Sequence, residues 1–287
     1  MDRDILSLMT KDMVGFSKGQ RLISEYILEN YDKAAFMTAG RLGKMVGVSE
    51  STVVRFAAKL GYDGYPGMRR ALQDMIRSRL TSVQRIEVSK DLIDVKNVIG
   101  DVLSSDMSKI QMTLELADRE TFELAVDMIL EAKHIYVAGM RSAAALANFM
   151  VFYLNLIMEN VYLVNDSAQN EIFDKLFRIN SDDLFIGISY PRYSSRTLTA
   201  MRFAKSAGAK ILGITDGESS PFVGIADINL FAKSDMISFL DSLVAPLSLI
   251  NALLVSVGIR SNETLSDTFR RLEKIWSDSE VYEGSAH

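Results

Sequence analysis

The stretch "DDLFIGISYPRYSSRTLTAMRFAKSAGAKILGIT", residues 182–215, decides the fold class of this 287-residue chain. An apolar run of strand length comes first, a helical pattern follows from residue 195, and a second apolar run closes the stretch. Strands that alternate with helices of this length are typical of parallel sheets covered by their crossover helices. The stretch therefore predicts a strand, a helix and a second strand parallel to the first.

The same alternation extends to both sides of this stretch. Strands are expected near residues 134–140, 160–165, 182–190, 209–215 and 227–233, with helical patterns between them and at the end. We expect an α/β fold with a five-stranded parallel sheet in the flavodoxin-like order 2-1-3-4-5, sandwiched by helices. Ligands of such sheets bind at the carboxyl ends of the strands where the strand order reverses, here between strands 1 and 3.

Residues 1–80 instead show helical periodicity with almost no strand pattern. Within "FMTAGRLGKMVGVSESTVVRFAAKLGYDGY", residues 36–65, Thr38 can begin a short helix carrying Leu42, Met45 and Val46, and Gly47 can end it. Ser49 can cap a second helix that runs to about residue 60. This all-α segment is predicted to be a helix-turn-helix domain. An ordinary helical hairpin with solvated charges is the alternative.

Charge separates the two parts of the chain. The net charge is −5, yet residues 1–80 contain 13 Lys and Arg against 9 Asp and Glu, and residues 36–80 contain 8 against 3. A basic first part on an acidic remainder indicates that only the first part contacts a polyanion such as DNA. Base readers and phosphate contacts are expected on the second helix and around it. The candidates are Ser49, Ser51, Thr52, Arg55, Lys59, Lys44, Arg69 and Arg70.

Composition limits the chemistry of the chain. The absence of cysteine excludes disulfides, thiol catalysis and Cys-based zinc sites. Only two histidines occur, His134 and His287, so neither a His-rich metal site nor a Ser-His-Asp triad is expected, and no cofactor is predicted. The N-terminus carries charges where a signal peptide would be apolar. We therefore expect a cytoplasmic protein, with residues 1–80 binding DNA, 81–108 forming a helical linker and 109–287 forming the α/β domain.

Two loops at the predicted reversal of strand order carry hydroxyls and arginines next to the start of a helix. They are "GMRSAA" after strand 1 and "SYPRYSSRT" after strand 3. A helix N-terminus offers free backbone N–H groups and partial positive charge, which suits phosphate, although serines there can also serve only as caps. The candidate ligand-binding residues are Gly139, Arg141, Ser142, Ser189, Arg192, Ser194, Ser195, Arg196 and Thr197.

Both parts of the chain resemble known families. "VGVSESTVVRFAAKLGYDGY", residues 46–65, resembles the helix-turn-helix of RpiR/MurR-type bacterial transcription regulators, which show "GVS-x-x-T-[VI]-x-R-F" followed by "K-L-G-[FY]-x-G-[FY]". "AGMRSAA" at residues 138–144 and "SPF" at residues 220–222 are similar to stretches of the sugar isomerase (SIS) domain. The resemblance implies a phosphosugar-binding module behind a DNA-binding domain.

One SIS signature departs from its usual form. The family motif "S-x-S-G-x-T" aligns with Ser189 and Thr197, but the inserted residues Pro191, Arg192 and Tyr193 lengthen the loop, and Ser195 stands where the motif has glycine. The extra cation favours a ligand with a second negative group, such as a sugar acid phosphate. Pairing of Arg192 with a protein carboxylate is the alternative.

These observations predict a DNA-binding regulator of carbohydrate metabolism that senses a phosphorylated sugar or sugar acid and acts as a homodimer or homotetramer. A phosphosugar isomerase or lyase with an accessory helical domain is the alternative, and an oligomerisation module without an effector is a third. Isomerisation needs a base near the reacting carbons. His134 lies at the wrong end of its strand, and nothing singles out Asp166 or Glu171. No catalytic residue is therefore expected.

Overall fold

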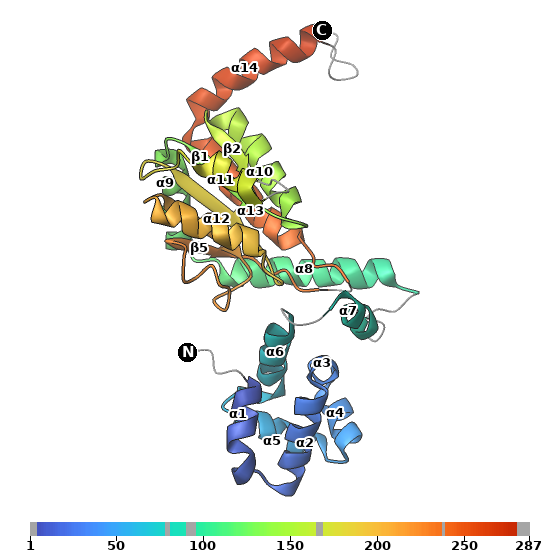
Figure 1. Ribbon diagram of the computed structural model, residues 1–287. Helices are drawn as coiled ribbons and strands as arrows, with labels where there is room; N and C mark the ends of the chain where they lie inside the picture. The colour runs from blue at the N-terminus through green and yellow to red at the C-terminus, as the bar shows by residue number, and fades with distance from the viewer. Residues whose placement is uncertain (1–4, 78–80, 90–95, 165–168, 237–238, 280–287) are drawn as a thin grey trace. The chain divides into compact units, whose positions relative to one another are not determined.

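The computed structural model describes residues 5–77, 81–89, 96–164, 169–236 and 239–279. The chain divides into two compact units. Residues 1–102 and 236–241 form the first, a helical unit, and residues 103–235 and 242–287 form the second, an α/β unit. Figure 1 shows both units with their helices and strands labelled.

The helical unit contains short helices around one apolar core. Its helices are α1 (Ile5–Asp12), α2 (Lys18–Glu29), α3 (Tyr31–Ala34), α4 (Ala39–Val46), α5 (Glu50–Lys59), α6 (Gly64–Arg77) and α7 (Ser82–Ser89), with a 3-10 turn η1 (Met13–Gly15). Ile23, Leu42, Val53, Phe56 and Leu72 are fully buried in the core that they share.

The predicted helix-turn-helix is confirmed by α4 and α5. Thr38 caps α4 by accepting a hydrogen bond from the Arg41 N–H at 3.2 Å, and Gly47 ends the helix with φ of +74°. Ser49 then caps α5 through the Thr52 N–H at 3.3 Å. Of the apolar residues on α4, Leu42 is fully buried and Met45 is 54% exposed.

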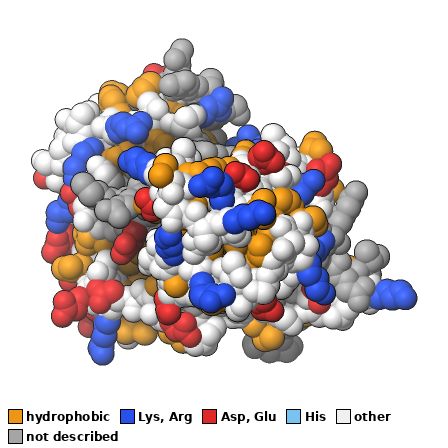
Figure 2. Space-filling model, turned by 90° about the horizontal axis from the view of Figure 1, so that it is seen from below, with side chains coloured by type: hydrophobic (Ala, Val, Ile, Leu, Met, Phe, Trp, Pro, Cys, Tyr) orange, Lys and Arg blue, Asp and Glu red, His pale blue; other side chains and the backbone are white. Residues whose placement is uncertain are grey.

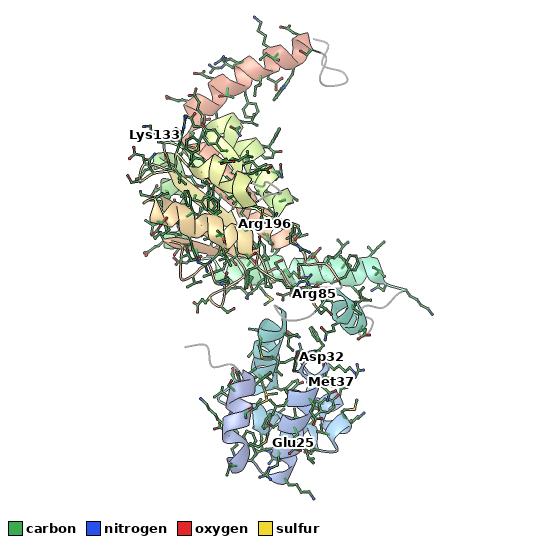
Figure 3. The ribbon with its side chains drawn as sticks, viewed as in Figure 1. Glu25, Asp32, Met37, Arg85, Lys133 and Arg196 are labelled. Carbon is green, nitrogen blue, oxygen red and sulfur yellow. The ribbon has the colours of Figure 1, made fainter. Side chains whose placement is uncertain are left out.

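A distant segment completes the helical unit. Residues 236–241 follow the last strand of the sheet in sequence, yet they cluster with residues 1–102, and Met236 packs against the apolar core of the helical unit. Arg85 on α7 is 1% exposed, and its Nη1 donates to Asp241 Oδ1 at 2.8 Å. The guanidinium of a buried arginine requires such a partner, because desolvation of an unpaired charge is costly. Arg85 is labelled in Figure 3.

The α/β unit contains one five-stranded parallel sheet. Its strands are β1 (Ile135–Gly139), β2 (Val161–Val164), β3 (Leu184–Ile188), β4 (Lys210–Thr215) and β5 (Ile228–Phe231), in the order β2-β1-β3-β4-β5. Every pairing is parallel, which confirms the predicted fold class and strand order. Because β1 pairs with both β2 and β3, the order reverses at the β1–β3 junction, where Gly139 stands opposite Ile188.

Helices cover both faces of this sheet. They are α9 (Arg119–Glu131), α10 (Ala143–Ile157), α11 (Gln169–Leu176), α12 (Ser195–Ser206) and α13 (Val244–Arg260). The last helix, α14 (Asn262–Asp278), packs on α10 and α13. A longer helix, α8 (Val98–Leu116), runs across the boundary between the two units. Asp118 caps α9 by accepting a hydrogen bond from the Thr121 N–H at 2.8 Å.

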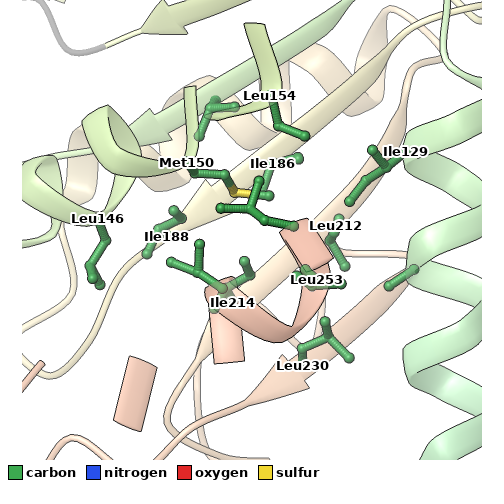
Figure 4. Packing of buried hydrophobic residues seen from close by; sticks show 14 of the residues in the cluster. Ile129, Leu146, Met150, Leu154, Ile186, Ile188, Leu212, Ile214, Leu230 and Leu253 are labelled. Atoms are coloured by element: carbon green, nitrogen blue, oxygen red, sulfur yellow. The ribbon is translucent and has the colours of Figure 1, made fainter. Parts of the chain in front are cut away.

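Two separate cores lie on the two faces of the sheet. The larger contains side chains of α9, α10 and α13 with one face of the strands, and Figure 4 shows Met150, Leu253 and Ile186 packed there. The smaller joins α11 and α12 to the other face, around Phe185 and Phe222. The central strands β1 and β3 are buried on both faces, so their sequences read as continuous apolar runs rather than alternating ones.

Candidate functional site

The first candidate site is the exposed face of α5. Ser51 and Arg55 are exposed there, one helical turn apart, and Arg55 Nε donates to the Ser51 main-chain oxygen at 3.2 Å. Ser49 Oγ lies 2.9 Å from Ser51 Oγ and 2.8 Å from Thr52 Oγ1. Three hydroxyls and a guanidinium thus gather on the first two turns of the helix. Major-groove recognition helices carry their base contacts at this position.

The other predicted DNA contacts surround this helix. Lys44 and Arg70 are exposed, and Arg69 is half-buried near Tyr65, whose pKa burial raises to about 12. Lys59 is exposed but makes contacts within the unit, since its ammonium donates to the Gly15 main-chain oxygen and lies 5.4 Å from the centre of the Phe16 ring. Figure 2 shows several Lys and Arg side chains among apolar and uncharged ones on the face that it views.

The second candidate site lies at the carboxyl ends of β1 and β3. After β1, Arg141 adopts a left-handed backbone with φ of +57°, which is uncommon for a residue other than glycine. Ser142 precedes α10 without any side-chain capping bond, so its exposed hydroxyl is not used by the helix. Gly139 has a packing role, because a Cβ there would lie 2.5 Å from the main-chain oxygen of Ala143. Non-glycine residues in the left-handed region cluster at functional sites.

After β3, a hydrogen-bonded chain fixes the start of α12. The Ser194 N–H donates to Ser189 Oγ at 3.0 Å, and Ser194 Oγ in turn accepts from the Thr197 N–H at 3.4 Å. Ser194 is therefore the cap of this 12-residue helix, and the neighbouring Ser195 is exposed. Thr197 is fully buried, and among the described residues its Oγ1 has no hydrogen-bond partner.

The predicted arginines flank this helix start. Arg196 belongs to the first turn of α12 and is labelled in Figure 3, and Arg192 lies in the inserted part of the loop. Both side chains are exposed. Because Gly139 pairs with Ile188, the loops after β1 and β3 leave the sheet from neighbouring strands. Two helix N-termini, several hydroxyls and three arginines therefore belong to one edge of the sheet, an arrangement suited to an anionic ligand.

Sequence reasoning assigned no binding role to four residues at this edge, Tyr190, Tyr193, Thr215 and Asp216. Tyr193 Oη donates to Asp216 Oδ1 at 2.8 Å, and Thr215 Oγ1 lies 3.1 Å from the same oxygen. Tyr190 is 6% exposed, and no partner for its hydroxyl occurs in the described part of the chain. Burial, with a smaller contribution from the Asp216 carboxylate, raises the pKa of the Tyr190 phenol well above its usual value. The position of Asp216 directly after β4 was the available signal.

The candidates for a catalytic base do not gather at this site. His134 Nδ1 lies 2.7 Å from Asp183 Oδ1 at the opposite edge of the sheet, where β1 and β3 begin. Glu171 is exposed in the first turn of α11, and Asp166 lies outside the described residues. In the part of the chain that the structure describes, no three His, Asp or Glu side chains form a metal-binding group. Within the same residues no single helix is long and apolar enough to cross a membrane, although α13 and α14 meet this test as a pair bent by 101°.

Two family models match the chain, one for each predicted part. The helix-turn-helix domain of the rpiR family matches residues 4–79, and the SIS domain matches residues 128–256. The first match contains the helix-turn-helix α4–α5, and the second contains the five-stranded sheet.

Curated relatives and solved structures agree with these matches. The HTH-type transcriptional regulator HexR of Pseudomonas aeruginosa is 23% identical over 282 residues, which cover 95% of each chain. The sugar isomerase domain of an RpiR transcription factor from Sphaerobacter thermophilus is 28% identical, with a TM-score of 0.59 over 62% of this chain and 98% of that domain. The NanR protein of Vibrio vulnificus, complexed with ManNAc-6P, is 22% identical and shares the fold, with a TM-score of 0.58 over 95% of this chain and 98% of NanR.

Proposed function

Because the chain is an RpiR-family helix-turn-helix regulator with a SIS domain, we propose that it controls genes of carbohydrate metabolism in response to a phosphorylated sugar or sugar acid. In this proposal α5 reads operator DNA in the cytoplasm, and the edge of the sheet at β1 and β3 binds the effector. The effector changes operator affinity only if it binds the DNA-competent and the DNA-incompetent arrangements unequally.

One observation carries the assignment of the effector site. The start of α12 holds Thr197, whose buried Oγ1 lacks a partner within the described residues, two positions after the exposed Ser195. A buried hydroxyl without a partner costs stability unless a ligand completes its hydrogen bonding. A phosphate group at a helix N-terminus supplies such acceptors. The ManNAc-6P complex of NanR, a protein of the same fold, supports a phosphorylated sugar as the ligand class.

Thermal denaturation with a panel of phosphosugars tests this assignment. A ligand that binds only the folded state raises the unfolding midpoint by mass action, by about 2.7 kcal/mol at a concentration 100 times its Kd. We expect one hexose or pentose phosphate to raise the midpoint and to change the affinity for operator DNA in a gel-shift titration. The unphosphorylated sugar serves as the control and should do neither. A panel without any stabilising phosphosugar contradicts the proposal.

The proposal assigns no catalysis to the chain. Aldose–ketose isomerisation needs a general base within reach of the reacting carbons, and His134 belongs to the opposite edge of the sheet. The relatives named above are transcription regulators. Turnover of hexose or pentose phosphates by the purified protein would instead favour the isomerase alternative.

We further propose that the chain acts as a homodimer or homotetramer that associates through its α/β unit. An apolar groove of about 500 Å³ lies between α10, α13 and α14. Exposed apolar side chains of these helices are Phe152 (62%), Tyr153 (41%), Val255 (61%), Ile259 (71%), Phe269 (37%) and Ile275 (55%). At about 180 Å² for each aromatic side chain, Phe152, Tyr153 and Phe269 alone expose roughly 250 Å². The aliphatic side chains add to this surface, and apolar patches of a few hundred Å² mark interaction sites.

Ile259→Asp tests this association. A buried aspartate at the centre of an apolar interface lacks a counter-charge, so the variant is expected to fall from a multiple of the 32.0 kDa chain mass to that of one chain. Light scattering after size-exclusion chromatography measures the mass. Phe177→Asp is the matched control, because Phe177 is 67% exposed and follows α11, which packs on the opposite face of the sheet. An oligomeric Ile259→Asp variant, or a monomeric wild type, contradicts this interface.

A further inference from the structure

Tyr190 is a buried phenol next to the proposed effector site. It follows β3 by two residues and is 6% exposed, and its ring packs in the core shared by α10 and α13. No hydrogen-bond partner for its Oη lies among the described residues. Most buried polar groups in proteins are paired, and leaving one unpaired destabilises the fold. The buried Tyr190 hydroxyl can therefore donate one hydrogen bond, which no described residue accepts.

Asp216 provides a fixed acceptor at the neighbouring strand end. It directly follows β4 and is 6% exposed. Among the described residues, its carboxylate accepts two side-chain hydrogen bonds, both on Oδ1, from the Tyr193 hydroxyl at 2.8 Å and from Thr215 Oγ1 at 3.1 Å. Within the described residues no donor is bonded to Oδ2. The carboxylate is thus held in one orientation with an oxygen still able to accept.

The inserted part of the loop after β3 contributes a structural contact through Tyr193 in addition to the charge of Arg192. Pro191 is buried, and Tyr193 places its hydroxyl on the Asp216 carboxylate 23 residues away in sequence. The insertion therefore ties the loop after β3 to the end of β4. Thr215 and Ser220 belong to the same hydrogen-bond network, because Thr215 Oγ1 also lies 2.8 Å from Ser220 Oγ.

The negative charge of Asp216 determines which part of a phosphosugar can bind to Tyr190 and Asp216. The Asp216 carboxylate repels phosphate and carboxylate groups, so it is unsuited to the anionic end of an effector. A sugar hydroxyl both donates and accepts a hydrogen bond. The neutral Tyr190 phenol can donate to such a hydroxyl, and the Asp216 carboxylate can accept from it. Burial favours the neutral form of this phenol, as the direction of its pKa shift indicates.

We propose that Tyr190 and Asp216, braced by Tyr193, form a subsite that binds hydroxyl groups of the sugar ring or chain, next to the phosphate-binding start of α12. This subsite rests on the proposed function, because it assumes a phosphosugar at the edge of β1 and β3. In this proposal, the residues that follow β3 and β4 distinguish one phosphosugar from another. An acidic group of the effector, if the effector has one, belongs beside Arg192 and not beside Asp216.

Calorimetric titration of single-residue variants tests the subsite. The probes are inorganic phosphate, glycerol 3-phosphate and the hexose 6-phosphate that binds wild type most tightly. We expect Tyr190→Phe and Asp216→Asn each to weaken hexose 6-phosphate binding by about tenfold or more and to change inorganic phosphate binding by less than about twofold. Ser195→Ala should weaken all three probes, since it removes a hydroxyl from the phosphate end.

Tyr190→Phe separates binding from a structural role. This variant removes one oxygen and keeps the Tyr193–Asp216 bond, so its unfolding midpoint should equal or exceed that of wild type. If the wild type binds a hexose 6-phosphate and Tyr190→Phe and Asp216→Asn bind it equally well, the subsite is overturned and the effector site stands. The subsite is also overturned if these variants weaken binding of inorganic phosphate by the same factor as binding of the hexose 6-phosphate. A wild type that binds no phosphosugar overturns the proposed function together with the subsite.

Discussion

Replacement of Arg55 by alanine is expected to abolish specific operator binding and to leave phosphosugar binding intact. Arg55 lies on the exposed face of α5, within the second turn of the helix. Loss of one arginine contact to a base edge costs about 1–3 kcal/mol. A dimer that reads two half-sites loses this contact twice, so specific binding should weaken by two orders of magnitude or more. Fluorescence anisotropy with labelled operator DNA at fixed salt concentration measures the loss.

Arg119→Ala is the matched control for the Arg55 variant. It removes the same charge from the exposed first residue of α9, in the α/β unit, and should leave operator affinity within about twofold of wild type. Non-specific binding through phosphates should survive in the Arg55 variant, because the surrounding basic side chains remain. Unchanged operator affinity of Arg55→Ala would exclude Arg55 as a base contact.

Thr197→Val is expected to stabilise the protein and to weaken effector binding. The buried Thr197 hydroxyl lacks a partner among the described residues, and valine keeps nearly the same shape without this oxygen. Removing an unpaired buried hydroxyl should raise the free energy of unfolding by about 1 kcal/mol. If the hydroxyl binds the effector phosphate, the Kd for the effector should rise by about tenfold. Chemical denaturation and calorimetric titration measure the two effects on one sample.

Thr199→Val distinguishes this result from a general effect of valine in α12. Thr199 Oγ1 already donates to the Ser195 main-chain oxygen at 2.9 Å, so its loss should not stabilise the protein and should leave effector affinity unchanged. Ser194→Ala provides a second comparison, because loss of a helix cap costs about 0.5–2 kcal/mol of stability. A Thr197→Val variant that binds the effector as tightly as wild type would remove Thr197 from the site.

Local signals made much of the fold predictable. Thr38, Gly47 and Ser49 mark helix ends through interactions within a few residues, so their roles follow from the sequence alone. The apolar runs of the strands and the intervening helices likewise fix the sheet and its order.

The parts that the sequence did not reveal depend on contacts between distant residues. The bond between Tyr193 and Asp216 spans 23 residues, and that between Arg85 and Asp241 spans 156. Tyr190 reads as an apolar residue at a strand end, and its unpaired hydroxyl exists only once the surrounding core has formed. No periodicity or motif encodes such pairings, because they depend on how elements pack after they form.

The segment at residues 236–241 bears on how the protein is made in the cell. The helical unit needs Asp241 to neutralise the buried Arg85, so this unit is not completed when residue 102 leaves the ribosome. At 5–20 residues per second the ribosome takes roughly 7–28 s to synthesise the intervening chain. During that interval α7 lacks the Asp241 carboxylate that accepts a hydrogen bond from Arg85 in the folded unit. Folding of the amino-terminal unit is thereby tied to synthesis of the sheet that precedes this segment.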